Sequence, residues 1–320
     1  MKILVSGGAG FIGSHVVDAY LAANHEVVVV DDLSTGHAHN LNPAARFVRA
    51  DIRDRAAVAE LMARERPAVL NHHAAQMDVR RSVADPVFDA EVNLVGLLNL
   101  LEEGRQQGLR QIIFASSGGT VYGDAQQLPA REGDPTVPLC PYGVTKLASE
   151  NYLHYFAHAY GMRYVTLRYA NIYGPRQDPH GEAGVIAIFI GQLLRNESPV
   201  INGTGRQTRD YVYVGDVARA NLLALDRDVN GPVNIGTGGE TDVNRLFALL
   251  CTITGVQAPE RHGPAKLGEQ LRSALDPSRA RAVLGWEASV PLADGLAKTV
   301  AYFRQRVDDG RALPAGPTQA

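Results

Sequence analysis

A tyrosine and a lysine four residues apart have the clearest chemical potential in this chain. Tyr142 and Lys146 open the segment Tyr142–Tyr160, whose pattern predicts a long helix. Because positions i and i+4 share one face of a helix, the phenol and the ammonium can point into one cleft. A free phenol has a pKa of about 10, and a nearby ammonium stabilises its phenolate. The spacing therefore predicts a general base that removes a proton from a substrate hydroxyl.

A glycine-rich segment near the start predicts a dinucleotide site. The pattern Gly8-x-Gly10-x-x-Gly13 follows the apolar run Lys2–Ser6 and opens the helical pattern Phe11–Ala23. Glycines at these positions permit a tight turn, close approach of the backbone to a pyrophosphate, and packing of helix on strand. The helix N-terminus adds free N–H groups and the positive end of the helix dipole.

Acidic residues end the next two predicted strands. Asp31 lies close to the spacing expected of the residue that binds the ribose hydroxyls. A carboxylate there would repel a 2′-phosphate, so NAD is favoured over NADP. Asp51 and Ile52 end the following strand. They could hold the amino group and the ring of adenine, or Asp51 could cap the next helix.

The elements that must position these residues alternate along the first half of the chain. Short β-branched runs precede longer helical patterns, and the run Val27–Val30 does not alternate with polar residues. Such runs are typical of strands buried on both faces of a parallel sheet. We therefore expect an α/β fold with a Rossmann-like doubly wound sheet. The second half is punctuated by glycine and proline and predicts a smaller, mixed α/β substrate lobe at the C-terminal side.

This pattern also predicts the domain boundaries. Residues 1–170 form the expected NAD-binding Rossmann domain, rejoined by about 211–236. The remaining segments of 171–307 form the expected nucleotide-sugar-binding lobe, and 308–320 a flexible tail.

Composition limits the partners. The 320 residues carry a net charge of -3, so no global positive field would attract nucleic acid or an anionic membrane. Cys140 and Cys251 are the only cysteines, too few for a disulfide framework and without metal spacing. His72 and His73 have no third ligand at suitable spacing, so we expect no metal. The apolar start is too short for a signal peptide, and we expect a cytoplasmic protein.

Four segments together resemble the extended short-chain dehydrogenase/reductase family, most closely its UDP-glucose 4-epimerase group. They are Ser6–Gly13, Thr120–Gly123, Pro141–Lys146 and Arg209–Val217. The resemblance runs from Met1 to about Phe303.

The resemblance implies roles for particular residues. Tyr142 and Lys146 would be catalytic and would also touch the cofactor, NAD. The other implied cofactor contacts are Gly7, Gly10, Phe11, Ile12, Gly13, Asp31, Asp51, Ile52, Ala74, Ala75, Gln76, Asn93 and Tyr169. The implied substrate contacts are Thr120, Asn171, Arg209, Lys266, Glu269 and Ser273.

Two positions depart from the family pattern. Gly118 stands where the family usually has a catalytic Ser or Thr. Ser117 or Thr120 could supply the hydroxyl, or a water could replace it, and we assign Ser117 as the catalytic hydroxyl. Lys266-Leu267-Gly268-Glu269 replaces the usual Arg-Pro-Gly-Asp. Lys266 could still neutralise phosphate, although it lacks a bidentate fork.

The implied reaction is the 4-epimerisation of a UDP-hexose. C4 is oxidised to a ketone, and hydride returns to either face. Ser273 stands where glucose-only relatives often have a bulky Tyr, so UDP-GlcNAc and UDP-GalNAc should react as well as UDP-Glc and UDP-Gal.

Other readings stay open. The alternatives are a UDP-glucuronic acid 4-epimerase, a dehydratase or another nucleotide-sugar oxidoreductase, and a non-catalytic dinucleotide-binding regulator. Gly119 and Thr120 replace the acidic pair of dehydratases, and the intact Tyr142–Lys146 pair argues against a regulator.

A homodimer is expected from two helical segments. Val87–Arg105 and Tyr142–Tyr160 carry long apolar faces, and relatives pair these two helices across an interface. Both faces could instead be covered by the sheet.

Overall fold

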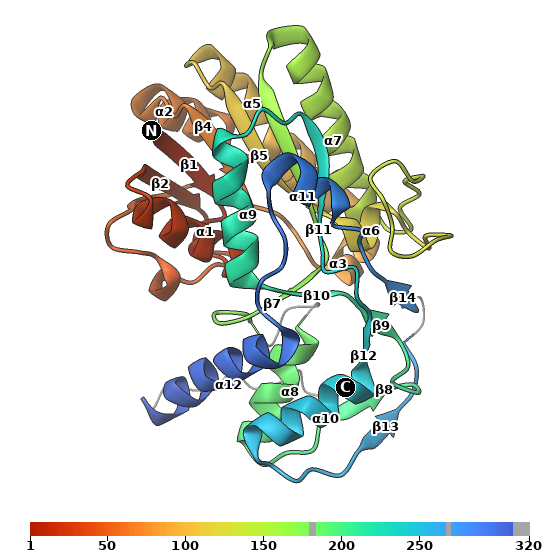
Figure 1. Ribbon diagram of the computed structural model, residues 1–320. Helices are drawn as coiled ribbons and strands as arrows, with labels where there is room; N and C mark the ends of the chain where they lie inside the picture. Colours follow the sequence, from red (N-terminus) through yellow and green to blue (C-terminus); the bar gives the residue numbers. More distant parts are fainter. Residues whose placement is uncertain (179–183, 267–269, 310–320) are drawn as a thin grey trace.

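The central feature of the fold is a seven-stranded parallel sheet (Figure 1). The computed structural model describes residues 1–178, 184–266 and 270–309. Neighbouring strands follow the order β11-β6-β5-β4-β1-β2-β3, and every pair is parallel. The strands are β1 (Lys2–Ser6), β2 (Glu26–Asp31), β3 (Arg46–Arg49), β4 (Val69–His72), β5 (Gln111–Ser117), β6 (Arg163–Tyr169) and β11 (Gly231–Ile235). The predicted Rossmann-like fold is confirmed.

Helices cover both faces of this sheet because its strands are apolar on both sides. Ile3 and Val5 of β1 pack in one core with α1 and α9, whereas Leu4 packs in a second core with α2, α5 and α7. Successive side chains of a strand point to opposite faces, which explains the division. These helices are α1 (Phe11–Ala22), α2 (Arg55–Glu65), α5 (Gly96–Gln106), α7 (Pro141–Tyr160) and α9 (Val214–Asp226).

A smaller lobe of helices and short strands lies below the sheet in Figure 1. Its helices α8, α10 and α12 pack around their own apolar core. Its short strands pair as β10-β7, β12-β9-β14 and β13-β8. The helices are α8 (Val185–Leu194), α10 (Val243–Thr254) and α12 (Leu292–Asp308); the strands are β7 (Asn171–Tyr173), β8 (Val200–Asn202), β9 (Thr208–Arg209), β10 (Tyr211–Tyr213), β12 (Thr241–Asp242), β13 (Arg261–Gly263) and β14 (Arg272–Ser273).

Short helices join the main elements. They are η1 (Ala38–Asn40), α3 (Val79–Ala84), α4 (Pro86–Ala90), η2 (Glu91–Val95), α6 (Gly118–Val121) and α11 (Ser278–Leu284). No helix in the described ranges is long and apolar enough to cross a membrane.

The chain returns to the large sheet after entering the smaller lobe. Helix α9 packs on α1, and β11 extends the sheet beside β6. This arrangement supports the predicted return of about 211–236 to the first domain, and the two-domain division stays a prediction. Of the predicted tail, Asp308 is the last residue of α12, and 310–320 lie outside the described residues.

Candidate active site

The glycine-rich turn is shaped by close backbone contacts. Gly7 has a φ of +72°, and a Cβ there would lie 2.5 Å from the backbone N of Ala74. A Cβ at Gly13 would lie 2.2 Å from the carbonyl oxygen of Gly7. Helix α1 begins at Phe11, and Gly10 before it offers no side-chain cap. Backbone N–H groups of the first turn, which includes Phe11, Ile12 and Gly13, are therefore available to an anionic ligand.

Asp31 lies buried at the end of β2, beside this turn. Its carboxylate accepts hydrogen bonds from the backbone N–H groups of Ala9 (3.0 Å) and Leu33 (2.9 Å). Burial raises the pKa of Asp31, and these two hydrogen bonds oppose the rise. The carboxylate is thus fixed against the glycine-rich turn, where a ribose would follow a bound pyrophosphate.

Asp51 does not cap the helix that follows it, α2. Its carboxylate forms an ion pair of 2.6 Å with Arg53, and this hydrogen bonding lowers the pKa of Asp51. Asp54 is the residue that caps α2, by accepting from Ala56 and Ala57. The capping alternative for Asp51 is therefore wrong. Ile52 is buried beside Gly96 at the start of α5.

A buried polar network follows β4. Ala74 and Ala75 are half-buried in the loop, and the backbone N–H of Gln76 donates to Asn93 Oδ1 over 2.8 Å. Asn93 Nδ2 donates back to the carbonyl oxygen of Gln76 and to Asp89 Oδ1. The predicted cofactor residues Gln76 and Asn93 are thus brought together. Asp89 was missed because an isolated Asp on a short helix carries no local signal.

Tyr142 and Lys146 lie together on the first turns of α7. Lys146 Nζ is 5.7 Å from the centroid of the Tyr142 ring and donates to the carbonyl oxygen of Ala115 over 2.8 Å. Lys146 is only 3 % exposed. Burial lowers its pKa to about 8, while the charges of Asp89 and Glu150 oppose that shift. The spacing therefore brings together a phenol and a buried amine, as predicted.

Ser117 ends β5, and the next residues form α6. Thr120 Oγ1 donates to the carbonyl oxygen of Ser117 over 3.4 Å, so the hydroxyl of Thr120 is directed at backbone. At Gly118 a Cβ would lie 2.4 Å from Leu275 Cδ1. Leu275, 1 % exposed, fills the space that the family's usual Ser or Thr would need. Sequence reasoning missed Leu275, since it lies far along the chain.

Tyr169 lies at the end of β6, beside Ser117 in the strand register. Its hydroxyl accepts from Asn221 Nδ2 over 2.8 Å, and burial raises its pKa. The His73 ring stacks on the Tyr169 ring with centroids 6.2 Å apart. His72 donates or accepts at Ser6 Oγ over 2.6 Å, depending on its tautomer. The two histidines therefore lie at the strand end, and in the described ranges no cluster of metal-ligating side chains occurs.

Three of the predicted substrate residues, Asn171, Arg209 and Ser273, lie on short strands of the smaller lobe. Arg209 in β9 pairs with Ser273 in β14, and a Cβ at Gly119 would lie 3.8 Å from Ser273 Oγ. Asn171 begins β7, and its N–H donates to the carbonyl oxygen of Asp210. Ser273 therefore lies next to the segment that carries Ser117.

Asp210 holds this region together. Its carboxylate accepts from the N–H and the hydroxyl of Thr237, the N–H of Gly238 and the N–H of Leu275. It is fully buried between the neighbours Arg209 and Tyr211. Its place inside the Arg209–Val217 motif was the signal that could have identified it.

Two further predicted substrate residues follow β13 in the sequence. Lys266 is exposed after β13, and Glu269 lies outside the described residues.

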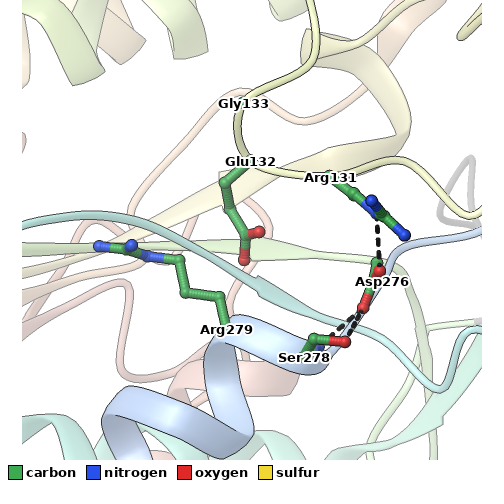
Figure 2. A pocket seen from close by; sticks show the side chains of 6 residues that line it. All are labelled: Arg131, Glu132, Gly133, Asp276, Ser278 and Arg279. Atoms are coloured by element: carbon green, nitrogen blue, oxygen red, sulfur yellow. Dashed lines mark hydrogen bonds and ion pairs between the residues drawn. The ribbon is translucent and has the colours of Figure 1, made fainter.

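A cavity of about 500 Å³ lies elsewhere and has no predicted site residue in its lining (Figure 2). Arg131 there pairs with Asp276 over 3.1 Å. Glu132 accepts from the N–H of Asn234, and Arg279 donates to the carbonyl oxygen of Pro232. Glu132 and Arg279 thus satisfy the outer edge of β11, a structural role that accounts for their charges.

The amino-acid sequence of this chain matches known proteins. Residues 3–236 match the NAD dependent epimerase/dehydratase family. The chain belongs to this family. A UDP-glucose 4-epimerase of Mycolicibacterium smegmatis is 47% identical over 313 residues, 96% of this chain and 99% of that one. Membership in the family confirms the predicted cofactor, NAD, and the prediction that the chain is an enzyme.

Solved structures of the family agree in fold. The UDP-glucose 4-epimerase of Thermotoga maritima with UDP-glucose has a TM-score of 0.94 and 47% identity, covering 96% of this chain and 100% of that one. The UDP-glucose 4-epimerase of Thermus thermophilus with NAD has a TM-score of 0.91 and 43% identity, covering 95% and 99%.

Proposed function

We propose that this chain is an NAD-dependent 4-epimerase that interconverts UDP-glucose and UDP-galactose, and also the corresponding N-acetylhexosamines. The three relatives described above are named UDP-glucose 4-epimerase, and the match to this chain covers nearly their whole length. The observation that carries the proposal is the buried Lys146 beside Tyr142. With Lys146 next to it, the phenol of Tyr142 can act as the base for a substrate hydroxyl.

The described residues fit NAD. The tight turn at Gly7 and Gly13 leaves backbone, rather than side chains, facing the start of α1. First-turn N–H groups of α1 would hold the pyrophosphate, and Asp31 would accept from the ribose hydroxyls. Asp51 and Ile52 would contact adenine. When bound, NAD supplies the reversible oxidation of the C4 hydroxyl, and it should stay bound because each cycle regenerates it.

Proton handling falls to Tyr142. Its phenolate removes the proton of the 4-hydroxyl as C4 becomes a ketone, and the phenol returns a proton when the alcohol re-forms. Lys146 stabilises the phenolate as an ammonium. Ser117 is the hydroxyl we assign to the substrate oxygen, which is supported by the engagement of Thr120 with backbone and by the absence of a side chain at Gly118.

The substrate lobe would hold the nucleotide more firmly than the sugar. A guanidinium such as that of Arg209 suits a diphosphate, and Asn171 lies at the start of the neighbouring strand β7. Binding energy on UDP anchors the substrate, while a loosely held 4-keto sugar can present either face. Lys266 and Glu269 remain proposed contacts near the nucleotide.

A dehydratase is the nearest rival. That reaction needs an acid and a base at C5 and C6, where Gly119 provides no functional group and Thr120 provides only a neutral hydroxyl. A UDP-glucuronic acid 4-epimerase shares the C4 chemistry, so the choice of sugar needs measurement.

The test is a paired measurement of bound nucleotide and product. Purified protein is denatured and its NAD quantified, and an intact sample is incubated with UDP-glucose alone. We expect near-stoichiometric NAD, formation of UDP-galactose, and no accumulation of NADH or free ketone. Release of a keto product with one equivalent of NADH would instead identify a simple oxidoreductase.

The proposed enzyme is a homodimer. Apolar side chains are exposed on the helices expected to pair: Val87 on α4, Val95 on η2, and Val144, Tyr152 and Tyr155 on α7. Such a patch is typical of an interface between subunits. We expect twice the chain mass by analytical ultracentrifugation, and a monomer for the double variant Val144→Glu and Tyr152→Glu. A wild-type monomer at micromolar concentration would contradict the proposal.

The proposed setting is the cytoplasm, without nucleic-acid or membrane partners. Neither Cys140 nor Cys251 forms a disulfide, which fits a reducing compartment.

A further inference from the structure

Asp89 lies on α4 and contacts α7, the helix that carries Tyr142 and Lys146. The proposed reaction does not use its carboxylate. It is 0 % exposed. Its Oδ1 accepts from Gln76 Nε2 (3.1 Å) and Asn93 Nδ2 (3.0 Å), and its Oδ2 accepts from Thr145 Oγ1 (2.8 Å). All three donors are neutral, and no ion pair joins Asp89 to another described residue. Burying a carboxylate without a counter-charge is costly, so its retention calls for an explanation.

The residue after Thr145 on α7 is Lys146, a buried cation. Its Nζ donates a hydrogen bond to the neutral carbonyl oxygen of Ala115. An ammonium in such a place also needs a compensating charge. The negative charge of Asp89 acts on Lys146 and raises its pKa against the effect of burial.

The other charged groups around Lys146 are already compensated or neutral. Glu150, on the same helix, is neutralised by Arg168, whose Nη2 lies 2.6 Å from Glu150 Oε2. His72 and His73, at the end of β4, have their pKa values lowered by burial and stay neutral. The guanidinium groups of α3 belong to residues exposed to solvent, Arg80 and Arg81, and are screened. Asp89 is therefore the uncompensated negative charge.

We propose that Asp89 is a positioning residue whose buried charge keeps Lys146 an ammonium, so that Lys146 can support the Tyr142 phenolate. The proposal deepens the proposed function and rests on it for the role of Tyr142. Without Asp89, the proton on Lys146 is lost at lower pH, and the phenolate loses its partner there.

The hydrogen bonds allow charge and geometry to be separated. In Asp89→Asn, the new Oδ1 can accept from Gln76 and Asn93, and the new Nδ2 can donate to Thr145 Oγ1. The single hydroxyl proton of Thr145 could then go to the carbonyl oxygen of Tyr142, which lies 3.0 Å from Oγ1. The matched variant Thr145→Val removes the hydroxyl and keeps the charge. Asp89→Ser removes the charge with less bulk, in case the Asn variant does not fold.

The chain allows Lys146 to be titrated directly. It has four lysines, Lys2, Lys146, Lys266 and Lys298. Selective ¹³C labelling of lysine therefore gives few Cε signals, and the variant Lys146→Arg assigns the one that matters. This readout does not depend on catalysis, so it tests the role of Asp89 whether or not the protein epimerises UDP-sugars. Failure of the wild-type protein to epimerise UDP-sugars would overturn the proposed function and leave the role of Asp89 to be decided by the titration.

The titration of Lys146 Cε is compared in the wild type, Asp89→Asn, Asp89→Ser and Thr145→Val, each with NAD content and thermal midpoint recorded. We expect the Lys146 midpoint to fall by about one pH unit in both Asp89 variants, and to stay at the wild-type value in Thr145→Val. The alkaline limb of kcat should move down by the same amount. An unmoved midpoint in the Asp89 variants, or an equal shift in Thr145→Val, would overturn the proposal.

Discussion

Ser273 lies directly across from Arg209 in the parallel pairing of β14 with β9. The residue proposed to bind the diphosphate and the residue proposed to gate the sugar are thus held in fixed register. Ser273 is 5 % exposed, and Gly119 lies next to its hydroxyl. A larger side chain at position 273 would therefore reduce the space beside Ser117, where the sugar would bind and react.

Enlarging this side chain should change the choice of sugar. In Ser273→Tyr, the phenol would occupy the room that an N-acetyl group needs. We expect the ratio of kcat/KM for UDP-GlcNAc to that for UDP-Glc to fall at least about tenfold, which corresponds to about 1.4 kcal/mol. Ser273→Ala keeps the volume small and should keep the wild-type ratio. Equal ratios in the Tyr variant and the wild type would disprove the gate.

Restoring the family's usual hydroxyl should be harmful here. In Gly118→Ser the new Cβ would meet the buried side chain of Leu275. Overpacking of this kind costs about 1–3 kcal/mol, so the free energy of unfolding should fall. Adding Leu275→Ala should recover part of the loss, measured as a coupling energy in a double-mutant cycle by urea unfolding. Purely additive effects would show that the two positions do not compete for space.

Two histidines at the end of β4 should make the fold sensitive to acid. Burial lowers the pKa of His73 to about 3 and that of His72 well below its usual value. Between these values and about 6.5, the unfolded chain binds more protons than the folded chain, so stability is lost as pH falls. Each histidine contributes about 1.4 kcal/mol per pH unit in that window.

The variant His73→Phe checks this linkage, since a phenyl ring can keep the stack on Tyr169. The slope of unfolding free energy against pH, measured between about pH 6.5 and pH 4.5, should be smaller in the variant than in the wild type. Identical slopes would mean that His73 becomes protonated in the folded protein.

Much of this arrangement could be predicted from local sequence. The glycine-rich turn, Asp31 and the Tyr142–Lys146 pair are signals within one or two elements, and apolar runs such as Val27–Val30 indicated the parallel sheet. Strand β4 ends in two polar residues, Asn71 and His72, which an apolar run does not indicate. Asn71 is buried and donates a hydrogen bond to Asn221 on α9.

The rest depends on contacts between distant positions. Asp89 meets Thr145, 56 residues away, and Leu275 fills the space at Gly118 from the far end of the chain. No periodicity records such pairs, so a sequence reading could see the missing hydroxyl at 118 but not what replaced it. The same limit applies to the contacts of the Asp210 carboxylate, whose partners come from two separate segments, Thr237–Gly238 and Leu275.

The most direct test of the account is an NMR assay of purified protein, without added NAD, on UDP-glucose, UDP-GlcNAc and UDP-glucuronic acid separately. The account predicts that UDP-galactose and UDP-GalNAc form, and that Tyr142→Phe lowers the rate by about 10²-fold or more while NAD stays bound. If all three sugars remain unchanged even after NAD is added, or if Tyr142→Phe reacts as fast as the wild type, the proposed epimerisation is contradicted.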